Sequence, residues 1–212
     1  NMGVTKIRER LGLSPLADSV MDSVENGASR IYCIPVKATT EGTISEIKKT
    51  GDSSGNCTAE GKPNNAYSVI VEFTGKGGFN TALFTCSIDN GFSKSDEGTL
   101  PMTGEYEIPG TGVTLKFTQD SSTPEESFQI GDTFTFTTTA PQMTNADALA
   151  AIGKLGQFDE FFEFVHVVGE STPAMWAAVS EAQAELEELK HKPLLFIVEA
   201  GNIGKEIGRA HV

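Results

Sequence analysis

The residues that could support catalysis or metal binding are few and widely spaced. The histidines are His166, His191 and His211, and none stands at ligand spacing from another histidine, a cysteine or a carboxylate. His166 falls inside an apolar run, which favours a packed, hydrogen-bonded core histidine over a general base. The sequence therefore predicts no metal site and no histidine-dependent catalysis.

Residues 169–173, GESTP, are the nearest approach to the nucleophile motif GxSxG, which is absent. Ser171 and Thr172 are better explained as caps of the following helix. Glu170 stands where α/β folds bind anions, but its own charge would repel a phosphate. An enzyme site at the strand ends near Glu170 and Glu199 remains an alternative, but we expect no enzymatic activity.

Two glycine-containing turns resemble functional motifs, but neither predicts a binding or catalytic site. Residues 75–79, GKGGF, are not a phosphate-binding loop because no Gly-Lys-Ser/Thr follows, so they read as a hairpin turn. Residues 87–93, SIDNGFS, resemble the Asp-box turn of sialidase propellers, with Asp89 bonding backbone amides and Gly91 turning the chain. A single copy predicts a hairpin and no propeller. The sequence therefore predicts no catalytic, cofactor-binding or metal-binding residue.

The cysteines are Cys33, Cys57 and Cys86, an odd number without CxxC spacing. They predict neither a disulfide framework nor a zinc site, and buried free thiols are the expected state. Whether Cys57 and Cys86 pair is left open by the sequence.

The charge balance limits the classes of partner. The chain has 212 residues with 29 acidic and 16 basic side chains, for a formal net charge of -13. Nucleic acid is disfavoured because phosphate binding needs concentrated positive charge. No run of about 18 apolar residues could span a membrane, and charges among the first ten residues replace the apolar core of a signal peptide. We expect a soluble globular protein without membrane insertion or a secretion signal.

The two ends of the chain have α/β character. Near the start, a helix is predicted over 15–26 and a buried strand over 31–36. Later, a helix from about 145 to 155 precedes a strand over 161–168, which is expected to be covered on both faces so that Phe164 and Val168 are buried. A long helix begins at residue 173, and a strand over 194–198 follows it. The apolar stripe expected on the long helix is Met175, Val179, Ala182, Leu186 and Leu189.

The middle of the chain has the period-two pattern of half-buried strands. Alternation is clear near 67–74, 81–88, 113–118 and 133–137, with turn residues between these runs. We expect an antiparallel sandwich of about six to eight strands with its aromatic residues facing inward. These inward residues are Tyr67, Phe73, Phe84, Phe117 and Phe134.

The predicted fold is an α/β core with an inserted domain. Residues 1–38 and 140–212 form the core, made of βαβ units with a parallel or mixed sheet flanked by helices. Residues 39–139 form the inserted antiparallel β-sandwich. We assign the two terminal parts to one hydrophobic core, because the first helix and strand alone could not bury their apolar side chains.

Several longer runs resemble the tail sheath proteins of contractile phages and phage-like particles. The resemblance covers roughly residues 14–200, and its most specific pieces are GTGVTLKF at 110–117, GDTFTFTTTAP at 131–141 and VVGESTPAMW at 167–176. It implies a structural virion protein without a cofactor. Subunits would form hexameric rings around a tail tube and shorten to drive the tube through a host envelope, after assembly in the host cytoplasm.

The ends of the chain depart from the family pattern, in which terminal arms add strands to neighbouring subunits. The sequence opens near the first core helix and closes with GNIGKEIGRAHV, which does not read as a strand-forming arm. We therefore expect a core fragment or a divergent short form that is monomeric or weakly associated alone. The alternative function is a β-sandwich carbohydrate- or receptor-binding module on an α/β scaffold.

Overall fold

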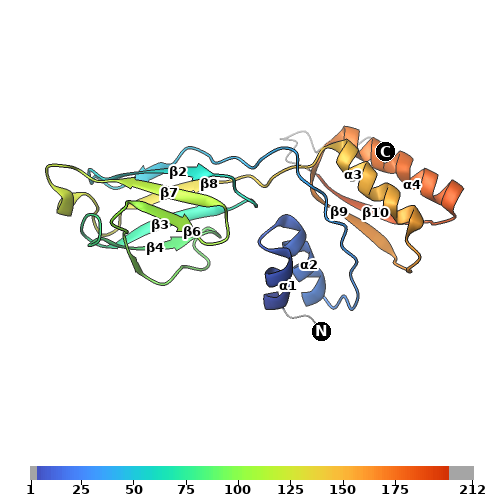
Figure 1. Ribbon diagram of the computed structural model, residues 1–212, viewed down its shortest axis with the longest axis horizontal. Coiled ribbons are helices and arrows are strands. Elements are labelled where there is room, and N and C mark those ends of the chain that lie inside the picture. Colours follow the sequence, from blue (N-terminus) through green and yellow to red (C-terminus); the bar gives the residue numbers. More distant parts are fainter. Residues whose placement is uncertain (1–3, 201–212) are drawn as a thin grey trace, which may run out of the picture. The chain divides into compact units, whose positions relative to one another are not determined.

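A computed structural model describes residues 4–200 and shows a mixed α/β protein with two compact units (Figure 1). The described part of the α/β unit comprises residues 4–11, 15–40 and 142–200, and the β unit comprises 12–14 and 41–141. Most strands lie in antiparallel sheets, and one small pair is parallel. Among the described helices, none is both long and apolar enough to cross a lipid bilayer.

The β unit contains two antiparallel sheets that enclose one core. The five-stranded sheet has the order β1 (Lys48–Thr50), β8 (Thr133–Thr137), β3 (Ser68–Gly75), β4 (Leu83–Ser87) and β5 (Gly98–Thr99). The three-stranded sheet has the order β2 (Asn56–Gly61), β7 (Val113–Thr118) and β6 (Glu105–Ile108). The antiparallel pairing predicted for the middle of the chain is confirmed, although the sequence analysis missed β1, β2, β5 and β6.

Phenylalanine rings fill the core of the β unit. Phe73 is fully buried and stacks on Phe128 at 4.4 Å between ring centroids, while Phe117 and Phe134 meet it edge-on at 5.9 and 6.0 Å. These offset and edge contacts are the arrangements that aromatic quadrupoles favour. All five aromatic residues predicted to face inward are buried, namely Tyr67, Phe73, Phe84, Phe117 and Phe134.

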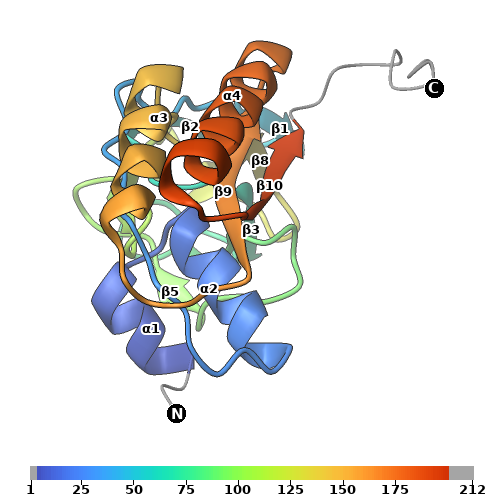
Figure 2. The ribbon, with the colours of Figure 1, turned by 90° about the vertical axis from the view of Figure 1, so that its right-hand side faces the viewer.

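The α/β unit combines helices with a two-stranded sheet. Its elements are α1 (Val4–Leu11), α2 (Pro15–Glu25), α3 (Asn145–Gly153), the 3-10 turn η2 (Lys154–Gln157), β9 (Phe164–Ser171), α4 (Pro173–Lys190) and β10 (Leu195–Ala200). Helix α4 connects the parallel strands β9 and β10, which makes one βαβ unit. Helices α3 and α4 cover one face of this pair, as two views show (Figures 1 and 2).

Local signals explain where the helices begin and end. Thr144 and Asp147 form a reciprocal capping box at α3, and Thr172 caps α4 ahead of Pro173. Helix α4 ends at His191, whose positive φ of 53° terminates the helical hydrogen bonding. The predicted helices over 15–26 and from 173 are confirmed. Within the expected apolar stripe, Leu189 is an exception because 67% of it is exposed.

The strand predicted over residues 31–36 is wrong. This segment has no strand pairing, and its side chains anchor it instead: Ile34 packs on the core of the α/β unit. Tyr32 meets Phe158 edge-on at 4.9 Å and donates a hydrogen bond to Glu160 at 3.0 Å. Pro35 supplies no N–H for a sheet ladder. Consequently the described sheet of this unit has two strands. The first part of the chain contributes helices α1 and α2 to the unit and no strand among the described residues.

Replacing Phe73 with alanine should lower the free energy of unfolding by about 3 to 5 kcal/mol, because the cavity lies among four other rings. Phe92→Ala is the matched control, since 91% of Phe92 is exposed and its loss should change stability by less than about 0.5 kcal/mol. Urea unfolding of both variants measures this. A loss below about 1 kcal/mol for Phe73→Ala would contradict the packing described.

Residues 41–141 should fold alone, because they enclose their own aromatic core. A variant that lacks residues 41–141, with residue 40 joined to residue 142 by a short Gly/Ser linker, should also unfold cooperatively. The junction is favourable because Thr39 and Thr40 both donate backbone hydrogen bonds to the Gln142 carbonyl at 3.0 Å. Calorimetry of both pieces tests this, and a non-cooperative transition in either would refute independent folding.

Candidate functional site

The parallel strands β9 and β10 form a sheet of only two strands among the described residues. Leu195 pairs with Phe164 and Ile197 with His166, and the register shifts after Val198. Within residues 4–200, neither strand has a second strand neighbour, so each has one unpaired edge. Parallel strands are normally found in larger sheets that are covered on both faces. The pair therefore presents unpaired N–H and C=O groups to any additional strand.

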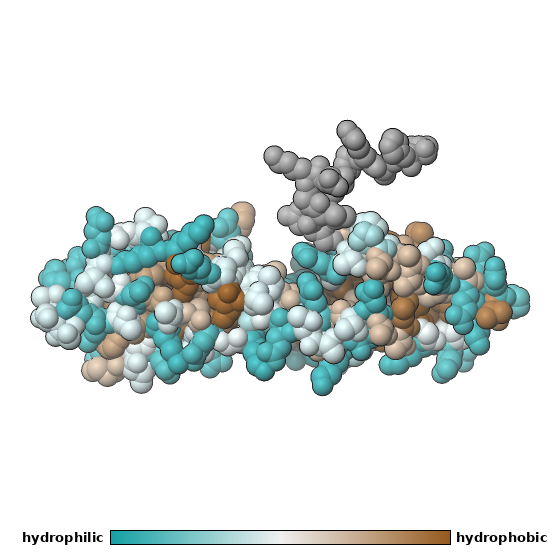
Figure 3. Space-filling view, turned by 90° about the horizontal axis from the view of Figure 1, so that it is seen from above, coloured by the Kyte–Doolittle hydropathy of each residue, from teal (hydrophilic) through white to brown (hydrophobic). Residues whose placement is uncertain are grey.

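One face of this pair is open apart from a contact between His166 and α2, and it carries exposed apolar side chains. Its exposed side chains are Phe164 at 52%, Leu195 at 61% and Ile197 at 44%, and they lie on the face opposite the one covered by α3 and α4. The prediction that Phe164 is buried on a doubly covered strand is wrong, so Phe164→Ala should not carry the cost of a core cavity. Elsewhere the surface is mostly hydrophilic with separate apolar patches, as the face shown in Figure 3 illustrates.

A chain of polar side chains connects α2 to this open face. His166 Nε2 lies 2.9 Å from Glu199 Oε1, and His166 Nδ1 lies 3.0 Å from Ser19 Oγ. In the neutral ring the carboxylate requires a proton on Nε2, so Nδ1 accepts from the Ser19 hydroxyl. The other oxygen, Glu199 Oε2, accepts a hydrogen bond from the Gly169 amide at 3.0 Å. His166 is hydrogen-bonded, as expected, but its side chain is 31% exposed instead of lying in the core.

The serine, histidine and carboxylate stand in the order of a catalytic triad, but the surroundings of Ser19 differ from those of a nucleophile. Ser19 lies in the interior of α2, where backbone amides are engaged in the helix. A serine nucleophile needs amides directed at the developing oxyanion, which a helix interior does not offer. The chain of contacts therefore acts as a tie that positions α2 on β9. The spacing of Ser19, His166 and Glu199 in the sequence gave no signal of it.

The strand-to-helix junction places its predicted residues in different roles. Thr172 caps α4 by accepting from the Met175 amide at 3.4 Å, as predicted. Ser171 is not a cap: its hydroxyl donates to the Glu199 carbonyl at 2.5 Å and accepts from Trp176 Nε1 at 2.7 Å. Glu170 is exposed and has no ion-pair partner among the described residues. The junction thus joins β9, α4 and β10 without assembling a reactive group.

The turn after β4 in the β unit is held by its own side chains. Asp89 accepts hydrogen bonds from the Ser93 hydroxyl at 2.5 Å, the Ser93 amide at 2.9 Å and the Ser87 hydroxyl at 2.8 Å. The Gly91 amide donates to Ser87 Oγ at 2.8 Å, and Gly91 itself has a φ of 88°. The hairpin role predicted for this motif agrees with these contacts. It makes a rigid turn and no propeller blade.

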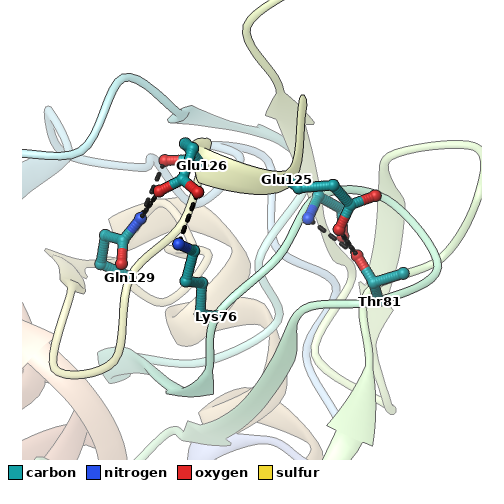
Figure 4. Close-up of polar contacts among 6 residues, drawn as sticks. Lys76, Thr81, Glu125, Glu126 and Gln129 are labelled. Carbon is teal, nitrogen blue, oxygen red and sulfur yellow. Dashed lines mark hydrogen bonds and ion pairs between the residues drawn. The ribbon is translucent and has the colours of Figure 1, made fainter. Parts of the chain in front are cut away.

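A second polar cluster lies around the 3-10 turn η1 (Pro124–Glu126). Glu126 pairs with Lys76 at 2.5 Å and accepts from Gln129 at 3.1 Å, while Thr81 donates to Glu125 at 2.9 Å (Figure 4). A shallow hollow of about 510 Å³ lies next to it, bordered by residues 51–54, 126 and 129–132. In the described part of the chain, no three His, Cys, Asp or Glu side chains gather as a metal site would require. The cluster fastens η1 to the β3–β4 connection.

The remaining candidate residues are the three cysteines and two of the histidines. Cys57 and Cys86 are buried free thiols, and burial raises their pKa values to about 12 and about 11, whereas Cys33 is exposed, contrary to expectation. His191 ends α4. His211 lies outside the described residues.

The family model described as "DUF2586, N-terminal domain" matches residues 3–209. No curated protein and no solved structure matches the chain.

The Asp89 turn gives a test of this local geometry. The hydrogen bonds from Ser93, followed by that from Ser87, lower the pKa of Asp89 from 3.8 to about 2. Because the folded-state pKa is depressed, the stabilising contribution is present above the ordinary pKa and is lost as pH falls through about 2. Carbon-detected NMR titration should find this midpoint, and Ser93→Ala should move it upward. An unshifted midpoint in the folded protein would contradict the turn.

Proposed function

The chain belongs to the DUF2586 N-terminal domain family, and we propose that it is a structural subunit of a contractile tail sheath. Such a subunit surrounds a tail tube together with copies of itself, in hexameric rings, and the sheath shortens to drive the tube through a host envelope. It is a component of the virion tail, assembles in the host cytoplasm, and acts without a cofactor or enzymatic step.

The observation that carries this proposal is the unfinished β9–β10 pair. A two-stranded sheet is marginal alone, and unpaired edges recruit strands from other chains. The open apolar face adds to this demand, because Phe164, Leu195 and Ile197 remain in water. A protein that functions inside an assembly can leave both features for its neighbours to complete.

The segments that resemble tail sheath proteins also support the proposal by their place in the fold. Residues 110–117 contain all of β7 except its last residue, residues 131–141 contain β8, and residues 167–176 include the junction of β9 with α4. In the assembled protein, strands from neighbouring copies would extend the parallel pair into a larger parallel or mixed sheet flanked by helices. The β unit would then be an inserted sandwich on that core.

Ile197→Lys should strongly reduce assembly, because it places a charge on the apolar face while leaving the covered face intact. Leu189→Lys is the matched control, since Leu189 on α4 is also an exposed aliphatic residue at 67%. We expect the assembled fraction of Ile197→Lys to fall at least about tenfold, equivalent to about 1.4 kcal/mol. The control should assemble normally.

Sedimentation and negative-stain microscopy of the full-length gene product, with tail tube protein present, provide the measurement. Added salt should favour assembly, because it screens repulsion between subunits that each carry a formal charge of -13. Circular dichroism checks that both variants fold. A wild-type protein that never polymerises under these conditions would refute the sheath proposal, and normal assembly of Ile197→Lys would exclude this face as the interface.

A further inference from the structure

A hollow lies on the outer face of the five-stranded sheet of the β unit. Its volume is about 320 Å³, at the lower end of the roughly 300–1,000 Å³ typical of small-ligand sites. The lining residues come from β1 and the segment before it, from β8, from β3 and from the turn after β4. They include Glu46, Lys48, Ser68, Ile70, Asn90 and Thr137.

The wall of this hollow is rich in polar groups that have no protein partner. Within residues 4–200, no hydrogen bond or ion pair engages five side chains of the lining: the Glu46 carboxylate, the Lys48 ammonium, the Ser68 and Thr137 hydroxyls and the Asn90 amide. The two hydroxyls and the side-chain amide can each donate and accept hydrogen bonds. The Glu46 carboxylate can only accept them, and the Lys48 ammonium can only donate them.

The hollow is also held in shape before any ligand arrives. Asn90 sits in the turn that Asp89 holds, with a φ of 59°, and its backbone N–H donates to the Ser68 carbonyl at 2.9 Å, which leaves its side-chain amide free among the described residues. On another side, the Thr137 amide donates to Ser45 Oγ at 2.9 Å. A preformed wall lowers the ordering cost of binding.

Apolar surface accompanies these polar groups. Ile70 lines the hollow, and the turn that contributes Asn90 also carries Phe92, of which 91% is exposed. A pyranose ring has hydroxyl groups at its rim and C–H groups on its faces, so it requires this combination of hydrogen-bonding partners and apolar contact. Glu46 and Lys48 carry opposite charges, which favours a ligand without net charge.

We propose that this hollow binds a neutral saccharide unit. Glu46, Ser68, Asn90 and Thr137 bond its hydroxyl groups, Lys48 donates a further bond, and Ile70 contacts its apolar face. The site belongs to the β unit alone and does not depend on the assembly proposed above, so either proposal can fail without the other. As part of a tail, the β unit would attach to sugars while the α/β unit assembles.

The test uses the whole chain on an array of neutral mono- and disaccharides, including N-acetylated ones, followed by saturation-transfer NMR with the sugars retained. Thr137→Val and Glu46→Gln should each weaken binding about five- to tenfold, the usual effect of losing one hydrogen bond. Thr118→Val is the matched control, an exposed threonine on β7 of the other sheet, and it should bind like wild type.

Thermal unfolding confirms that the three variants remain folded. Saturation transfer that is weakened in Thr137→Val and Glu46→Gln but unchanged in Thr118→Val supports the site. The proposal is overturned if the wild-type chain retains no saccharide, if the double variant Thr137→Val/Glu46→Gln binds as wild type does, or if Thr118→Val loses binding equally.

Discussion

Every peptide group taken out of water needs a hydrogen-bond partner, and the two units of this protein satisfy that requirement to different degrees. In the β unit, eight described strands pair into two sheets around a core of phenylalanine rings. In the α/β unit, β9 and β10 have only each other among the described residues. That difference separates a unit that is complete by itself from one that has capacity for another chain, and the proposed function rests on it.

The open side of the β9–β10 pair is partly organised by the contact between Ser19, His166 and Glu199. Glu199 fixes the orientation of the imidazole, and the imidazole in turn holds the Ser19 hydroxyl of α2. The Gly169 amide completes the hydrogen bonding of the carboxylate. Helix α2 thus approaches one face through polar groups, while α3 and α4 bury the other through apolar ones. On the face that α2 approaches, Phe164, Leu195 and Ile197 stay exposed.

The sequence predicted elements well where a single pattern decided them. The alternation at 133–137 and the capping residue Thr172 identified β8 and the start of α4, because period and cap chemistry are local. The sequence-based predictions failed where packing between distant segments determined the local structure. The apolar run at 31–36 predicted a strand, yet Ile34 packs on the core of the α/β unit and the exposed Tyr32 contacts Phe158, without strand pairing among the described residues. The Ser19–His166 contact joins residues 147 apart in the chain, and the hollow beside Asn90 depends on register across three strands, so neither leaves a local pattern.

The segments that lead into and out of the β unit have a mechanical consequence. Thr43 and Thr139 are joined through their hydroxyls at 2.9 Å, and a bridge pairs Ile44 with Thr138. Thr39 and Thr40 bond the Gln142 carbonyl in the same antiparallel sense. A force that pulls the two segments apart would break these bonds one after another, as in unzipping, instead of shearing many at once. The β unit is therefore poorly placed to transmit tension through its two connections.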